Sequence, residues 1–295
     1  MNGCDSSKII VEERAPKARP FLRWAGGKQR LAPALLNLTP KDDSYNKYYE
    51  PFLGGGSLFF RLNPKSAILN DINSELINCY EQVKENIEIV IKKLDRYADL
   101  DSRSFYYRIR NRSTKSMSKT GRAARFIYLN KAAFNGIYRV NLSGKFNVPY
   151  GPSRTGLAIP SKLKLREVSK KLSCANFGIG DFEDILAEVK ANDFVYLDPP
   201  YPPASATSFF NHYDKNRFSW DDQVRVSVVF KNLADLGCKV MLSNSSHNEI
   251  INLYKEYNTY KLKTTRWIGS NGDRYKVHEI VVTNYDSDFS RGQDV

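Results

Sequence analysis

The chain has 295 residues, of which 41% are hydrophobic, and it carries 45 Lys and Arg against 32 Asp and Glu. This length and apolar content fit one large α/β domain, or a domain with an insertion, folded around its own core. The four cysteines and three histidines are scattered, without a Cys-x-x-Cys pair. We therefore expect neither a metal site nor a disulfide framework. No run approaches about 18 apolar residues and no secretory pattern is visible, so we expect a cytoplasmic protein with no membrane span.

Strand-like and helical patterns alternate along most of the chain. Predicted strands lie at 47–53, 66–70, 174–179, 193–197, 238–243 and 278–284. Helical patterns lie between several of them, at 74–95, 181–190 and 220–236. Such alternation is typical of a mostly parallel sheet covered by helices on both faces, so we predict an α/β fold. Residues 1–18 and 286–295 are predicted to be flexible tails.

Three features early in the chain point to a site for a nucleoside ligand. Residues 52–57 (FLGGGS) follow the first predicted strand, and glycines there allow a ligand to approach the backbone closely. Asp71 ends the next strand about twenty residues later, where a carboxylate binds the ribose of nucleoside cofactors. Upstream, Trp24 offers a stacking face and Lys28 a charge for a carboxylate. The alternatives are a phosphate-binding loop, an N-cap at Asp71 and a core position for Trp24.

One segment holds the whole excess of positive charge. Residues 102–166 contain 15 Lys or Arg and no acidic residue. A solvated helix face usually alternates its charges, so this segment favours a polyanionic partner. Interleaved aromatic residues suit a nucleic acid better than an anionic membrane. We predict an inserted recognition domain, helical over 121–133 and a loop or hairpin up to Gly151.

The run VYLDPPY at 195–201 ends a predicted strand with the side chains of a reactive site. Asp198 only accepts hydrogen bonds when ionised, and Pro199 and Pro200 leave backbone carbonyls on offer. Tyr201 adds a flat face for a planar ring. Together they form a socket for an exocyclic aromatic amine, whose nitrogen becomes nucleophilic when its lone pair is drawn out of conjugation. The alternative is a polar turn after a buried strand, with Tyr201 in the core.

Six motifs in this order resemble the Dam-type adenine-N6 DNA methyltransferases, which use S-adenosylmethionine. They are RWAGGK at 23–28, EPFLGGGS at 50–57, DINS at 71–74, FNGIYRVN at 134–141, GKFNVPYG at 144–151 and DPPY at 198–201. The resemblance covers residues 21–285, and the motif order is similar to that of the alpha class of amino methyltransferases. It implies a Rossmann-like methyltransferase fold with a seven-stranded sheet. It also implies a catalytic domain at 19–100 and 167–285 and a mainly helical target-recognition domain at 101–166.

The resemblance implies a role for each matching residue. S-adenosylmethionine would contact Trp24, Lys28, Phe52, Gly54, Gly56, Asp71, Asp181, Phe182 and Asp198. The catalytic residues would be Asp198, Pro199, Pro200 and Tyr201. Duplex DNA would contact Arg23, Phe134, Asn135, Arg139, Asn141 and Pro149. Arg23 stands where the family typically has lysine, and an arginine could contact a guanine through two hydrogen bonds.

We therefore expect an enzyme that methylates N6 of a flipped-out adenine in duplex DNA. The similarity of residues 134–151 to the recognition segment of GATC-modifying relatives implies GATC as the site. We expect a monomer that uses S-adenosylmethionine and no metal. Residues 205–218 would form a lid, and residues 269–276 would add phosphate contacts. The alternatives are an RNA adenine methyltransferase on the same fold, and a non-catalytic DNA-binding regulator.

Overall fold

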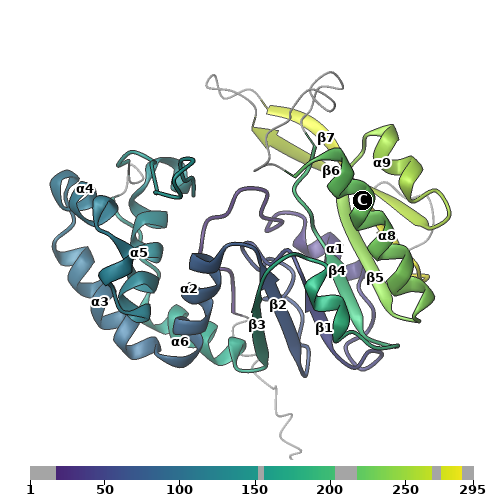
Figure 1. The fold of residues 1–295 in the computed structure, drawn as a ribbon, viewed down its shortest axis with the longest axis horizontal. Coiled ribbons are helices and arrows are strands. Elements are labelled where there is room, and N and C mark those ends of the chain that lie inside the picture. Colours follow the sequence, from purple (N-terminus) through teal and green to yellow (C-terminus); the bar gives the residue numbers. More distant parts are fainter. Residues whose placement is uncertain (1–17, 152–155, 203–217, 268–273, 288–295) are drawn as a thin grey trace, which may run out of the picture.

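A seven-stranded sheet lies at the centre of the described part of the chain (Figure 1). The computed structural model describes residues 18–151, 156–202, 218–267 and 274–287. The strand order is β3-β2-β1-β4-β5-β7-β6. The strands are β1 (Tyr48–Glu50), β2 (Ala67–Asp71), β3 (Ala175–Ile179), β4 (Phe194–Leu197), β5 (Lys239–Ser245), β6 (Asn258–Trp267) and β7 (Arg274–Thr283). Strands β1 to β5 pair in parallel, whereas β7 is antiparallel to both β5 and β6. The predicted α/β fold with a mostly parallel seven-stranded sheet is confirmed.

The helices differ in part from the predicted ones. They are α1 (Ala32–Leu38), α2 (Ser74–Glu85), α3 (Ile87–Asp99), α4 (Arg103–Asn111), α5 (Lys119–Ala132), α6 (Lys162–Leu172), α8 (Trp220–Asp235) and α9 (Asn248–Leu253), with short 3-10 helices η1 (Thr114–Ser116), η2 (Phe134–Gly136) and η3 (Asp184–Ala187). The single helix predicted over 74–95 is wrong, because Asn86 leaves the helical conformation at φ −131° and ψ 39° and divides it into α2 and α3. Strand β6 has no predicted counterpart, since an edge strand needs fewer apolar residues than a central one.

The helix predicted over 181–190 is also wrong. Only the 3-10 helix η3 forms there. The Asp184 carboxylate accepts a hydrogen bond from the backbone N–H of Asp181, and the Asp181 carboxylate accepts one from that of Glu183. Such local side-chain bonds satisfy the backbone donors in a turn and so compete with a regular helix.

Both faces of the sheet are covered. Successive side chains of a strand point to opposite faces. Tyr48 accordingly joins the core cluster that includes residues of α1, α2, α5 and α6, whereas its neighbour Tyr49 joins the cluster that includes residues of α8 and α9. Phe194 and Val195 of β4 divide between the two clusters in the same way. This two-sided core holds the carboxyl ends of the parallel strands side by side.

Helices α3, α4 and α5 form a lobe beside the sheet, at the left of Figure 1. Helix α5 packs against α3 and α4 within this lobe and also against α2. The guanidinium of Arg125 lies inside the lobe and donates to the carbonyls of Ile109 (3.0 Å) and Arg110 (2.7 Å) at the end of α4. After α5 the chain forms a hairpin over residues 134–151, with bridges between Ala133 and Tyr150 and between Val140 and Phe146. The hairpin therefore projects from the helix that fills the centre of the lobe.

Several predictions concern residues outside the described ranges. These are the tail at residues 1–17, most of the lid predicted at 205–218, and the final residues of the chain from 288. The phosphate contacts predicted at 269–276 involve side chains that the structure does not describe. No helix in the described ranges is long and apolar enough to cross a membrane.

Candidate active site

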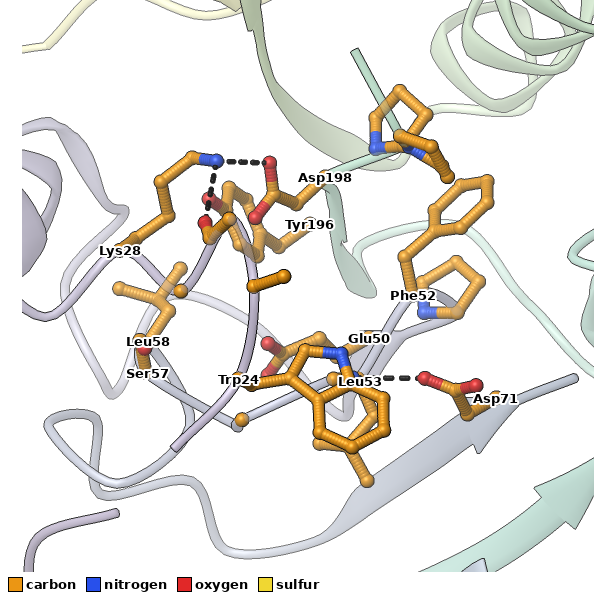
Figure 2. Close-up of a pocket in the computed structure, with 18 of the residues that line it drawn as sticks. Trp24, Lys28, Glu50, Phe52, Leu53, Ser57, Leu58, Asp71, Tyr196 and Asp198 are labelled. Atoms are coloured by element: carbon orange, nitrogen blue, oxygen red, sulfur yellow. Dashed lines mark hydrogen bonds and ion pairs between the residues drawn. The ribbon is translucent and has the colours of Figure 1, made fainter. Parts of the chain in front are cut away.

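A cavity of about 1170 Å³ opens at the carboxyl ends of the parallel strands. In open α/β sheets this edge is where ligands bind, because the loops that follow the strands meet there. Every predicted cofactor or catalytic residue except Gly56 lines the cavity: Trp24, Lys28, Phe52, Gly54, Asp71, Asp181, Phe182, Asp198, Pro199, Pro200 and Tyr201. In Figure 2, Lys28 and Asp198 face each other in the upper part of the view, and Trp24 and Asp71 lie in the lower part.

Asp71 anchors the glycine loop at one wall of the cavity. Its two carboxylate oxygens accept hydrogen bonds from the backbone N–H groups of Gly54 and Asn73, each at 2.9 Å. Burial raises the pKa of Asp71 above its ordinary value, and these two hydrogen bonds oppose that shift. The N-cap of α2 is Asn73, whose side chain accepts from Glu75 and Leu76, so the N-cap alternative for Asp71 is wrong. The carboxylate is left at the cavity wall.

Gly54 and Trp24 lie in close contact. The backbone of Gly54 has φ +46°, and a Cβ there would stand 2.8 Å from Cδ1 of Trp24. Only glycine permits this approach. The Tyr80 hydroxyl donates to the Gly54 carbonyl at 3.0 Å and fixes the loop from behind. Gly56 lies outside the cavity lining, and its N–H closes a turn onto the carbonyl of Leu53 at 2.7 Å.

Trp24 combines the two roles considered for it. It lines the cavity, and it also stacks with Tyr138 and Phe126 at ring-centroid distances of 5.3 and 6.2 Å. Both partners come from the lobe and its hairpin, so Trp24 joins the cavity to that part of the molecule.

Lys28 lies at the centre of a charged cluster on the opposite side of the cavity. Its Nζ is 2.9 Å from Oδ1 of Asp198, 3.8 Å from Oε2 of Glu279 and 3.0 Å from the carbonyl of Gly26. It also stands 4.2 Å from the ring centre of Tyr201, a cation–π contact. The DPPY turn is therefore part of the cavity and is held by charge from two other segments.

Tyr201 is fixed at its hydroxyl end. The hydroxyl donates to Oε2 of Glu279 at 2.8 Å. Burial and the nearby carboxylates of Asp198 and Glu279 raise the pKa of Tyr201 well above its ordinary value, so the phenol stays neutral. Tyr201 lines the cavity rather than lying in a core cluster. Glu279 has no signal in the sequence, because a single acidic residue within a strand forms no motif.

The two proline carbonyls differ in their surroundings. The side chain of Gln223 in α8 donates to the Pro200 carbonyl at 2.8 Å, and Asn244 in β5 donates to the Gln223 amide oxygen at 2.9 Å. Both amides are buried. Among the described residues no donor reaches the carbonyl of Pro199. Gln223 and Asn244 therefore hold the Pro200 carbonyl in place.

An aromatic wall closes a third side of the cavity. Phe182 stacks on Phe52 with ring centroids 5.1 Å apart, and Phe218 meets Phe52 edge to face at 5.8 Å. The guanidinium of Arg225 lies 4.8 Å from the ring centre of Phe182 and bonds Asp181 at 2.9 Å. Arg225 is a second site-forming residue without a sequence motif. The wall offers flat apolar surface to a planar ligand.

Buried Glu50 gives the folded protein a pH dependence that can be measured. It lies at the end of β1, lines the cavity and accepts a hydrogen bond from the Tyr48 hydroxyl at 2.8 Å. Burial raises the pKa of Glu50 to about 8. The unfolded chain releases this proton near a pH of about 4.3. Between these values the folded state binds more protons, so its free energy of unfolding falls as pH rises.

Glu50→Gln should remove this dependence, because glutamine cannot ionise. We expect the variant and the wild type to differ little in unfolding free energy at acidic pH, and the variant to gain relative to the wild type towards pH 8. Chemical denaturation over a pH series measures this. Glu88→Gln is the control, since Arg166 lowers the pKa of that exposed carboxyl. A constant difference between Glu50→Gln and the wild type across the series would contradict the prediction.

The predicted DNA-contacting residues divide into two groups. Arg23 lines the cavity, whereas Phe134, Asn135, Arg139, Asn141 and Pro149 lie on the hairpin outside it. Phe134 is 52% exposed, at the start of a turn in which Asn135 and Gly136 both have positive φ. An aromatic ring is thereby presented to solvent by a tight backbone turn.

The hairpin tip is ordered by its own side chains. Nε of Arg139 donates to Oδ1 of Asn147 at 2.8 Å, which directs the guanidinium. Oδ1 of Asn141 accepts from the N–H groups of Ser143 and Lys145 and so holds the turn. Arg139 therefore lies on a hairpin whose conformation is fixed by side-chain hydrogen bonds.

The fold and a family model together define the class of this protein. A parallel sheet with an antiparallel end and a cavity at the strand carboxyl ends make a Rossmann-like methyltransferase fold. A family model described as D12 class N6 adenine-specific DNA methyltransferase matches residues 24–268. A solved structure, the C-terminal domain of precorrin-6Y C5,15-methyltransferase from Rhodobacter capsulatus, has a TM-score of 0.37 at 10% identity, covering 90% of this chain and 92% of that one.

Two curated relatives are similar over nearly their whole length. The chain is 42% identical over 283 residues to the Type II methyltransferase M1.LlaDCHI of Lactococcus lactis subsp. cremoris, covering 94% of this chain and 99% of that protein. It is 33% identical over 268 residues to the DNA adenine methylase of Escherichia coli (strain K12), covering 90% and 95%. The chain belongs to the D12 class of N6 adenine-specific DNA methyltransferases.

Proposed function

We propose that this chain transfers a methyl group from S-adenosylmethionine to N6 of an adenine flipped out of duplex DNA, within the sequence GATC. The main support is the meeting of the Asp71 wall and the DPPY turn in one cavity. That cavity offers a nucleoside-binding wall and an amine socket to two ligands side by side. The hairpin with Phe134 and Arg139 supplies the means of reading DNA.

The residues present fit S-adenosylmethionine. Asp71 offers remaining lone pairs to a ribose, and the walls around Trp24 and Phe182 offer flat surfaces to a purine. Lys28 offers a positive charge to the carboxylate of the amino-acid part. When bound, this cofactor supplies a methyl group already activated by its positively charged sulfur.

The DPPY turn would act on the target amine. The Asp198 carboxylate and the Pro199 carbonyl would accept hydrogen bonds from the two N–H groups of the amine. These bonds would draw the nitrogen lone pair away from the ring and hold the nitrogen in line with the methyl group. The surplus proton then leaves through Asp198 or solvent. Flipping the nucleotide costs a few kcal/mol. Stacking on Tyr201 can offset this by roughly 1–3 kcal/mol.

A methylation assay tests the proposal. The purified protein is incubated with labelled S-adenosylmethionine and duplex DNA of mixed sequence, and modified adenines are located by sequencing. We expect N6-methyladenine within GATC. Label on adenine in another sequence would overturn only the site assignment, whereas no label on any duplex would overturn the function. Equal or better labelling of structured RNA would favour the RNA alternative. Binding of DNA by a protein without affinity for S-adenosylmethionine would favour the regulator.

Arg139→Ala tests the assignment of the hairpin. A guanidinium that bonds a guanine through two hydrogen bonds contributes about 1–3 kcal/mol of discrimination, so the preference for one guanine of the site should fall by about 5–150-fold. The measurement is kcat/KM on the site and on duplexes with that base pair changed. Arg166→Ala is the control, because it removes the same charge from exposed α6. An unchanged preference in Arg139→Ala would show that the base is read elsewhere.

A further inference from the structure

A buried asparagine in the lobe connects the hairpin to the cavity. Asn130 of α5 is fully buried at 0% exposure. Its Oδ1 accepts from the N–H of Arg23 at 2.8 Å, and its Nδ2 donates to the carbonyl of the same residue at 2.7 Å. The Nδ2 also lies 3.4 Å from the carbonyl of Gly136. One amide thus binds both backbone groups of one residue and reaches a third segment of the chain, which requires a side chain that both donates and accepts.

Asn130 joins a segment of the cavity wall to a segment of the hairpin. Arg23 is followed by Trp24 and by the turn that ends at Lys28, all in the cavity wall. Gly136 lies in the turn that presents Phe134, at φ +64°. The Arg23 side chain lies directly over Gly136, where a Cβ would overlap its Cδ. The cavity wall and the hairpin turn therefore meet at this amide.

A second set of contacts also connects the cavity wall to α5 and the hairpin. Trp24 stacks with Phe126 and Tyr138. Phe126 lies one turn before Asn130 on α5, and residues four apart share a helix face. A displacement of Arg23 relative to α5 would break the amide bonds and the stack together. Each of these polar groups would lose its hydrogen-bond partner, so the segments should keep one arrangement.

We propose that Asn130 is a positioning residue that couples DNA binding at the hairpin to ligand binding in the cavity. The inference rests on the proposed function, which supplies the two ligands. A ligand that orders the turn at Phe134 also orders the wall from Arg23 to Lys28, so the second ligand loses less conformational freedom. Such coupling is reciprocal, because each ligand changes the affinity for the other by the same factor.

The test measures this factor with sinefungin, an unreactive analogue of S-adenosylmethionine. Its Kd is determined with and without a duplex that carries the site found by sequencing. For the wild type we expect the duplex to tighten sinefungin binding by a factor within about 5–150. In Asn130→Ala the Kd without DNA should stay unchanged, and the tightening by DNA should be lost. If Asn130 were merely structural, Asn130→Ala would change the stability of the protein, or would change the sinefungin Kd equally with and without duplex. The ratio of these two Kd values would then stay as in the wild type.

Asn78→Ala is the matched control. Asn78 is another buried asparagine, and its Nδ2 donates to the Lys119 carbonyl at the start of α5, in the contact with α2. We expect its coupling factor to equal that of the wild type. Absence of coupling in the wild type, or full coupling in Asn130→Ala, would overturn the inference. Methylation by a wild type without coupling would leave the proposed function intact, whereas a wild type that neither binds sinefungin nor methylates DNA would end the proposed function itself.

Hydrogen exchange keeps the inference testable if Asn130→Ala does not fold. In the wild type, sinefungin alone should slow exchange at the backbone amides of the turn at 134–137, and duplex alone should slow exchange at the backbone amides of the cavity wall at 24–28. Protection confined to each ligand's own segment would overturn the coupling.

Discussion

Replacing Asp198 by alanine should lower the rate of methyl transfer by at least about 10²–10³-fold, the usual loss on removing one preorganised polar contact to a reacting group. The carboxylate follows β4 directly and is held at 2.9 Å by Lys28, so its oxygens occupy a fixed place in the cavity. Its removal would take away the proposed acceptor for the amine and would leave the Lys28 charge without that partner. Single-turnover transfer on a short duplex with saturating S-adenosylmethionine measures the effect.

The same variant should retain much of its ligand binding. Phe134 and Arg139, proposed to read DNA, lie on the hairpin, and Asp71 and Trp24 lie in the cavity wall across from Lys28. Duplex affinity should therefore stay close to that of the wild type, and sinefungin affinity should fall only in part. Asp235→Ala is the control, because that exposed carboxylate pairs with Lys231 on α8 and its loss removes the same charge. Transfer by Asp198→Ala at the wild-type rate would rule out the proposed role.

The wall residues were predictable because their signals are local. Glycines, an aspartate or DPPY at the end of a predicted strand indicate the site from a few adjacent residues. They do so because parallel strands end at one edge of the sheet, where ligands bind. Lys28 and Asp198 were each predicted separately, but nothing within either motif indicates that the two charges meet at 2.9 Å. That contact arises from the packing of segments far apart along the chain.

The residues that support the site were not predictable in this way. Glu279 comes from an antiparallel strand, and Gln223 and Asn244 come from α8 and β5. Each lies outside the six motifs, and only burial shows that it needs a partner. Asn130 belongs to the same class, because a lone amide inside a helix has no sequence pattern. The sequence therefore shows what contacts a ligand more readily than what holds those contacts in place.

Replacing Tyr201 by alanine should lower kcat/KM by about 5–150-fold, because stacking on an aromatic side chain contributes about 1–3 kcal/mol per base. The ring lies in the cavity beside Asp198, with the Lys28 Nζ 4.2 Å from its centre. In the proposed reaction, its loss would remove the surface that compensates for unstacking the target adenine. Steady-state kinetics on the cognate duplex measure the change, and DNA affinity should change little, since the hairpin is untouched.

Tyr201→Phe separates the ring from its hydroxyl. Phenylalanine keeps the stacking face and loses only the hydrogen bond to Glu279, a net contribution of about 1 kcal/mol. If stacking is what Tyr201 supplies, this variant should retain most of the activity that Tyr201→Ala loses. Equal impairment of the two variants would instead assign the role to the hydroxyl and its bond with Glu279. The contribution of Tyr201 would then lie in fixing the charged cluster around Lys28 rather than in holding a base.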